Sequence, residues 1–73
     1  MEFCILHQNK NATLFCKGVV LLVKDKVDYD KPYWVTDIEH DYIFGCYKTR
    51  ERATQIISEI YRSENGKYEM PCE

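Results

Sequence analysis

The chain has 73 residues, of which 45% are hydrophobic and 14% aromatic, and its formal net charge is −2 at pH 7. A chain of this length forms one small domain that buries only about 60% of the surface its unfolded form exposes, and it is too short for most self-contained enzymes. The aromatic content argues against disorder, the apolar runs are too short for a transmembrane helix, and the acidic balance argues against a duplex DNA or RNA binder.

Short apolar segments separated by polar turns are typical of strands, and they fill the first third of the chain. Residues 3–7 and 13–16 predict two short strands, with a polar turn at 8–11 between them. Lys17-Gly18 predicts a bulge or a tight bend before the next strand.

The strongest strand candidate is the segment 19–23, Val-Val-Leu-Leu-Val, because β-branched residues favour strands. It is apolar at both parities, so both of its faces need cover. The predicted helix can cover one face. We expect the other to meet a second subunit, with Val19, Leu21 and Val23 as the oligomer interface.

A hairpin and a helix follow. Residues 33–36 and 42–48 predict two strands around a loop at 37–41, and Gly45 marks a bulge or a place of close packing. Thr49 suits an N-cap, and a helix is predicted over about 50–63 because apolar residues recur there at helical spacing. These residues are Ala53, Ile56, Ile57, Ile60 and Tyr61.

Strands followed by one helix predict an α+β fold. We expect a single domain over 1–73 in which a small curled antiparallel β-meander of four or five strands lies within 3–48. The C-terminal helix packs on one face of this meander. Gly66 ends the helical segment, and residues 67–73 form a short tail in which Pro71 stops regular structure.

The four cysteines, Cys4, Cys16, Cys46 and Cys72, contain no Cys-x-x-Cys pair. The chain opens without the pattern of a secretion signal, so we expect a reducing cytoplasm, free thiols, no disulfide and no membrane insertion. His7 and His40 lie near no cysteine pair, so neither a metal site nor a cofactor is expected.

Residues 45–53, Gly-Cys-Tyr-Lys-Thr-Arg-Glu-Arg-Ala, resemble the strand-to-helix junction of small accessory proteins from Gram-positive phages, prophages and mobile elements. Those proteins often begin with a strand running into Ser-Gln-Asp-Gly, of which residues 7–10 keep the Gln and an Asn for the Asp. Many also end in a tail like residues 68–71. The resemblance implies an accessory protein acting in a bacterial host cytoplasm, and by analogy one that counters host defence.

Lys48, Arg50 and Arg52 surround the predicted helix start, where free backbone N–H groups and the helix dipole favour anions. Tyr42 and Tyr47 lie on the strand leading to that helix, and tyrosine rings stack on bases. These residues predict a nucleotide site at a subunit interface. The alternative is a solvated first turn with ordinary surface charges.

Aromatic residues crowd the predicted hairpin, and alternation turns about half of them outward. The outward set, around Trp34 and Tyr42, predicts a contact surface for a partner protein, unless the helix and the tail cover it. The acids of the middle segment lie in turns and lack the shielded cleft that general acid–base catalysis needs, so we expect no catalytic residues.

Three functions remain open from the sequence. The first is a non-catalytic phage or mobile-element protein that counters an anti-phage defence by binding a host protein. The second is a sponge that sequesters a signalling nucleotide at a subunit interface. The third is a small regulatory or structural phage protein. All three fit a homo-oligomer in the host cytoplasm.

Overall fold

The computed structural model describes residues 2–9, 12–63 and 65–72. Residues 10 and 11 of the predicted polar turn, and residue 73 of the predicted tail, lie outside the described residues. Within them the chain forms six strands and one helix, which confirms the α+β class. Their order is β1 (Phe3–Leu6), β2 (Thr13–Cys16), β3 (Val19–Val23), β4 (Tyr33–Asp37), β5 (Ile43–Tyr47), α1 (Arg50–Arg62) and β6 (Lys67–Glu69).

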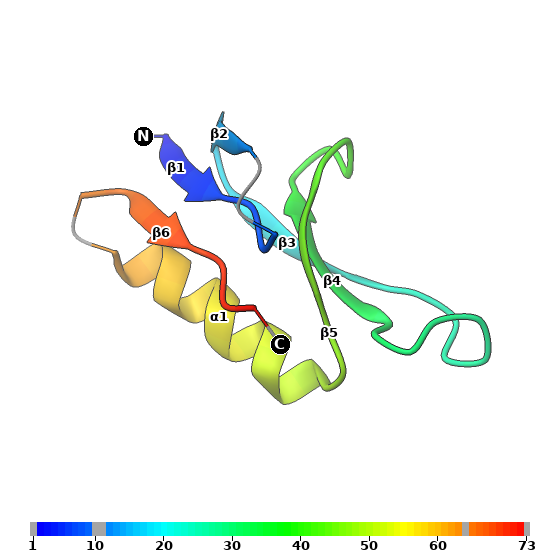
Figure 1. The fold of residues 1–73 in the computed structure, drawn as a ribbon. Helices are drawn as coiled ribbons and strands as arrows, with labels where there is room; N and C mark the ends of the chain where they lie inside the picture. The colour runs from blue at the N-terminus through cyan, green and yellow to red at the C-terminus, as the bar shows by residue number, and fades with distance from the viewer. Residues whose placement is uncertain (1, 10–11, 64, 73) are drawn as a thin grey trace.

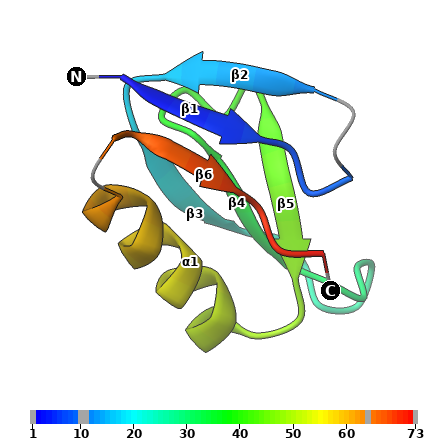
Figure 2. The ribbon, with the colours of Figure 1, turned by 60° about the vertical axis from the view of Figure 1, so that its left-hand side comes forward.

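The strands form two three-stranded sheets (Figure 1). In the first, β1 pairs antiparallel with β2 and parallel with β6. In the second, the order is β3-β4-β5 and both pairings are antiparallel. Part of the predicted tail is therefore a strand, which runs beside β1 after the chain has passed through α1 (Figure 2).

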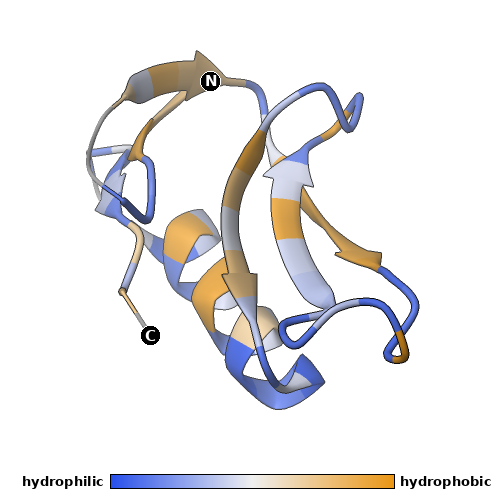
Figure 3. Cartoon of the chain, turned by 45° about the vertical axis from the view of Figure 1, so that its right-hand side comes forward, coloured by the Kyte–Doolittle hydropathy of each residue, from blue (hydrophilic) through white to orange (hydrophobic). Residues whose placement is uncertain are grey.

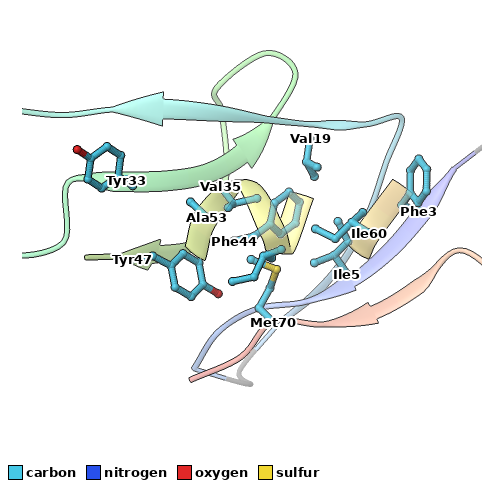
Figure 4. Packing of buried hydrophobic residues seen from close by; sticks show 11 residues of the cluster. Phe3, Ile5, Val19, Tyr33, Val35, Phe44, Tyr47, Ala53, Ile60 and Met70 are labelled. Carbon is cyan, nitrogen blue, oxygen red and sulfur yellow. The ribbon is translucent and has the colours of Figure 1, made fainter. Parts of the chain in front are cut away.

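The core lies between the two sheets and α1, which packs against β3, β4 and β5. Figure 4 shows side chains from both sheets and the helix converging there. The apolar stripe predicted on α1 is confirmed at Ala53, Ile56 and Ile60, which are fully buried. Its other two members differ, because Ile57 is only partly buried and Tyr61 is 48% exposed. The buried hydrophobic residues are Phe3, Ile5, Val19, Tyr33, Val35, Phe44, Tyr47, Ala53, Ile56, Ile60 and Met70.

A bulge in β5 turns Phe44 into this core. Val35 lies opposite Gly45 and Thr36 opposite Ile43, so Phe44 has no Cα partner on β4, and its ring is fully buried. A Cβ on Gly45 would lie 2.7 Å from the Tyr47 hydroxyl, because the tyrosine ring packs over the glycine. The bulge and the close packing expected at Gly45 are therefore both present.

The inner face of β3 belongs to the chain's own core. Val19 is 3% exposed and Leu21 packs against the buried cluster. The side chain of Val19 is therefore not available to a second subunit, contrary to the expectation from the sequence, and that of Leu21 is only partly exposed. Only Val23, at the end of the strand, is exposed. The misassignment arose because an apolar run at both parities does not say which parity faces inward.

The side chain of Gln8 joins the two sheets. Its Nε2 donates hydrogen bonds to the carbonyl oxygens of Cys46 (3.2 Å) and Pro71 (3.1 Å), and its Oε1 accepts one from the Cys46 N–H (3.0 Å). The Gln8 backbone N–H donates to the Phe44 carbonyl (2.8 Å). The Gln8 amide thus bonds to the N–H and the carbonyl of Cys46 on the outer edge of β5, as the backbone of a neighbouring strand would. Its bond to the Pro71 carbonyl also attaches the C-terminal segment to this edge.

The connection from α1 to β6 differs from the expected helix end. The helix stops at Arg62, and Ser63 caps it by donating from both its hydroxyl and its N–H to the Ile60 carbonyl. Gly66 lies in the following turn with a φ of 70°, a left-handed conformation that suits glycine. Its carbonyl accepts a hydrogen bond from the Cys4 N–H, which starts the parallel pairing of β6 with β1.

Candidate functional site

The N-terminus of α1 is built as the sequence predicts. Thr49 is the N-cap, and its hydroxyl accepts a hydrogen bond from the Arg52 N–H at 3.2 Å. Glu51 in the first turn and Arg62 in the last both complement the helix dipole. This end of the helix is therefore a fixed structure on which neighbouring cations are positioned.

A basic pocket of about 310 Å³ lies at this helix start, lined by Lys31, Lys48, Thr49 and Arg52. Lys48 and Arg52 were both expected here. Lys31 was not, because it comes from the loop before β4 and is far away in sequence. Arg50 is exposed and does not line the pocket. We call this set of four residues the basic pocket.

The tyrosines predicted to stack on a base do not accompany the basic pocket. Tyr47 is 1% exposed, and its hydroxyl donates to the Pro71 carbonyl at 3.0 Å. Tyr42 lies at the opposite end of β5, half-buried against the rings of His7 and Phe44. The expected stacking platform of Tyr42 and Tyr47 is therefore absent, because one ring is core and the other is too far along the strand.

Trp34 is half-buried beneath the loop that connects β3 and β4. The Tyr29 ring meets it edge-on at 5.3 Å between centroids, and Lys24 Nζ lies 5.1 Å from the Trp34 ring centroid. The indole Nε1 donates to the Lys31 carbonyl at 2.8 Å. Trp34 therefore anchors this loop, which makes it a weaker candidate for partner contact than the sequence indicated.

A second hollow, which the sequence did not predict, opens between the end of β2 and the β4–β5 turn. Two of its walls are apolar and accessible: Phe15 is 71% exposed and Ile38 is 55% exposed. Its volume is about 360 Å³. The lining residues, which we call the acidic cleft, are Glu2, Phe15, Cys16, Lys17, Asp37, Ile38 and Glu39.

The side chains that line the acidic cleft carry a net negative charge. Three carboxylates and one lysine line it. The pKa of the Cys16 thiol is raised, first by burial and then by the negative charges of Asp37 and Glu2, while a hydrogen bond from the Gly18 backbone opposes the rise. Cys16 therefore remains a neutral thiol at physiological pH, and the cleft offers no nucleophilic thiolate.

The shape of the acidic cleft is held by the β4–β5 turn. The Asp37 carboxylate accepts hydrogen bonds from the N–H groups of Asp41 (2.7 Å) and Tyr42 (3.0 Å). His40, which lies between Asp37 and the two donors, takes a φ of 62°, a left-handed conformation that occurs in tight turns. Ile38 is therefore displayed by a turn whose backbone is already fixed, a low-entropy arrangement for binding.

All four thiols are free in the structure. Burial also raises the pKa of the Cys46 thiol, against a smaller lowering by the charge of Lys31. Among the described residues no group of three or more His, Cys, Asp or Glu side chains is placed to hold a metal ion. No helix in that part of the chain is long and apolar enough to cross a membrane.

The acidic cleft escaped prediction because its two apolar walls come from separate sheets. Phe15 lies on β2 and Ile38 follows β4, and the pairing pattern of the sequence does not bring them together. The one available signal was the alternation in β2, where Leu14 and Cys16 pack toward the core and Phe15 faces outward.

No protein-family model matches the chain, and no curated protein or solved structure is significantly similar to it.

Proposed function

We propose that this chain is a small non-catalytic binding protein of phage or mobile-element origin, which counters a host defence by occupying a host protein. The junction at residues 45–53 supports the origin by resemblance. The observation that carries the binding role is the acidic cleft, where Phe15 and Ile38 stand exposed beside three carboxylates. Apolar side chains surrounded by charge on a fixed turn are characteristic of contact sites.

The chemistry of the acidic cleft selects a partner segment. Phe15 and Ile38 favour an apolar side chain inserted between them, and Glu2, Asp37 and Glu39 favour lysine or arginine beside it. Burial of an aliphatic or aromatic side chain contributes about 1.5–3 kcal/mol. The rim carboxylates add on-rate and orientation more than affinity, and their effect weakens with salt.

The test compares two apolar-to-serine variants in quantitative pull-downs from lysate of a Gram-positive host. Ile38→Ser should weaken capture of the partner about tenfold or more, since tenfold corresponds to about 1.4 kcal/mol. Val27→Ser is the matched control, because Val27 is 91% exposed at the tip of the β3–β4 loop and does not line the acidic cleft. Equal capture by both variants, or loss with Val27→Ser alone, would remove the acidic cleft from the proposal.

One observation favours the nucleotide sponge as a second candidate. The basic pocket places Lys31, Lys48 and Arg52 around a capped helix start, a geometry suited to phosphate groups. Without the expected tyrosines, recognition there rests on the phosphates and not on the base. This candidate therefore predicts binding that falls steeply with salt and discriminates poorly between bases.

The sponge is tested by thermal shift with linear and cyclic adenine and guanine nucleotides. If the basic pocket binds them, Lys48→Glu should abolish the stabilisation, because it places a carboxylate among the phosphate ligands. Arg50→Glu should leave it nearly unchanged, since Arg50 does not line the basic pocket. The same loss in both variants would indicate only a general charge effect, and no shift with the unaltered chain would exclude the sponge for these nucleotides.

A further inference from the structure

Of the two outer edges of the second sheet, that of β5 is occupied by Gln8, whereas that of β3 has no second strand beside it among the described residues. The sheet order β3-β4-β5 places β3 at one side with β4 as its only strand partner among the described residues. Figure 3 shows β3 as a strongly hydrophobic strand at the outside of the sheet. Charged residues and prolines usually protect an edge strand from pairing with another chain. The segment from Gly18 to Val23 contains neither.

The hydrogen bonds around β3 show which backbone groups face outward. The Lys24 N–H donates to the Pro32 carbonyl, so Lys24 points its backbone groups toward β4. Outward and inward groups alternate along an antiparallel strand, so those of Leu21 and Val23 face away from β4. Val19 agrees with this parity, because its N–H and carbonyl both bond to the Tyr61 hydroxyl, each at 2.8 Å.

Tyr61 therefore closes the edge at Val19 and leaves the outward groups of Leu21 and Val23 as the open part. The helix surface beside this edge is also partly apolar. Ile57 and Tyr61 lie one turn apart on α1 and, with Ser58 and Arg62, line a shallow groove. The groove lies on the same side of the molecule as this edge, because Tyr61 both lines the groove and bonds to Val19.

We propose that β3 pairs with β3 of a second copy of the chain about a two-fold axis, in an antiparallel register that sets Leu21 opposite Val23 of the partner copy. In this register Leu21 of each copy exchanges two backbone hydrogen bonds with Val23 of the other copy. The two-fold axis gives two such pairs, and therefore four backbone hydrogen bonds. The two second sheets become one continuous six-stranded sheet. The two α1 helices lie on the same face of it, with their Ile57 and Tyr61 sides toward each other.

Symmetry and charge both favour a second copy as the occupant. An isologous contact closes after two subunits, whereas pairing β3 with another edge such as β2 would leave edges open and build chains of molecules. The first charges that flank the open strand are Lys17 on one side and Lys24-Asp25 on the other. In the proposed register Lys24 lies opposite Val20, and antiparallel pairing brings Asp25 to the end of the other copy's β3 that carries Lys17.

The proposed register places Leu22 at the two-fold axis, where it lies opposite Leu22 of the partner copy on the outer face of the sheet. Light scattering on the purified full chain should give twice the 8.7 kDa chain mass at micromolar concentration. Leu22→Lys alone and Leu22→Glu alone should each give monomers, because like charges then face each other at the axis. An equimolar mixture of the two variants should recover the dimer mass, because each heterodimer sets a lysine opposite a glutamate.

A second variant separates the interface from folding. Val23→Pro removes only an outward N–H, a site where proline is tolerated in an edge strand, so circular dichroism should stay native while the mass falls to that of a monomer. A monomer for the unaltered chain overturns the proposal, and so does a dimer that survives both Leu22→Lys and Val23→Pro. A ladder of larger assemblies overturns it as well, in favour of an open edge-to-edge contact.

Discussion

Replacing Gln8 by leucine should lower the free energy of unfolding by about 3 kcal/mol, at about 1 kcal/mol for each side-chain hydrogen bond lost. Leucine has a similar volume but leaves the Cys46 N–H, the Cys46 carbonyl and the Pro71 carbonyl without the partner that Gln8 supplies. These groups are partly buried, so water replaces the amide incompletely. Urea denaturation followed by circular dichroism and Trp34 fluorescence measures the change.

Gln8→Glu is the matched control, because it keeps the acceptor for the Cys46 N–H and loses only the donor. At neutral pH its carboxylate faces two carbonyl oxygens, so this variant should be at least as unstable as Gln8→Leu. Those oxygens raise the carboxyl pKa of the folded variant above the unfolded value of about 4.3. Stability is then lost as pH rises through the folded pKa and regained below about pH 4.3.

The leucine variant should show no such pH dependence relative to the unaltered chain. A Gln8→Leu variant within about 0.5 kcal/mol of the unaltered protein, the range of ordinary surface substitutions, would contradict the role assigned to this amide. The result would then mean that β5 and the C-terminal segment are held by Tyr47 and Met70 without help from Gln8.

The elements predicted correctly are those whose signal is local. The α1 stripe needs only helical spacing, and Ala53, Ile56 and Ile60 are buried as that spacing requires. The N-cap needs one hydroxyl at one position, and Thr49 supplies it. Strand positions followed from β-branched runs and turn residues. Each of these patterns is complete within a few residues, so no knowledge of the rest of the chain is required.

The arrangement of the strands in two sheets was not predictable in the same way. β6 contains three residues, Lys67–Glu69, two of them charged, and so carries no periodic signal. It becomes a strand because β1 offers an edge and because Met70, at its end, is fully buried in the core. Gln8 was interpreted as part of a polar turn for a similar reason, since its amide partners lie 38 and 63 residues away in the sequence.

Helix geometry alone could have predicted which of the two arginines near the start of α1 lines the basic pocket. Residues two apart on a helix lie about 200° apart around its axis, so Arg50 and Arg52 do not face one pocket. The structure places Arg52 with Lys48 and leaves Arg50 outside. Lys31 joins them only through the fold of the β3–β4 loop, which Trp34 anchors through the Lys31 carbonyl. That contribution was beyond the reach of local patterns.

Gly18→Ala should lower the free energy of unfolding by about 2 kcal/mol, which is the contribution of two hydrogen bonds. A Cβ at this position would lie 2.7 Å from the Tyr61 hydroxyl and 3.0 Å from Ile38 Cδ1. Ile38 is exposed and free to shift, but Tyr61 withdraws only by giving up its two bonds to Val19. Thermal and urea denaturation of the single variant measure the cost.

A double-mutant cycle with Tyr61→Phe identifies that cause. Tyr61→Phe removes the same two hydrogen bonds, so it should cost about 2 kcal/mol by itself. Gly18 is not in a left-handed conformation, so alanine fits its backbone and reduces the freedom of the unfolded chain. In the Tyr61→Phe background, Gly18→Ala should therefore stabilise the protein by about 0.5 kcal/mol.

The sign of the Gly18→Ala effect thus depends on a single oxygen atom at residue 61. Costs that add to about 4 kcal/mol in the double variant would place the penalty in the Ile38 contact and contradict the role given to Tyr61. A change of sign would show that Gly18 is glycine so that the Tyr61 hydroxyl can reach the edge of β3. That hydroxyl closes the edge at Val19, so the same contact fixes where the open edge of Leu21 and Val23 begins.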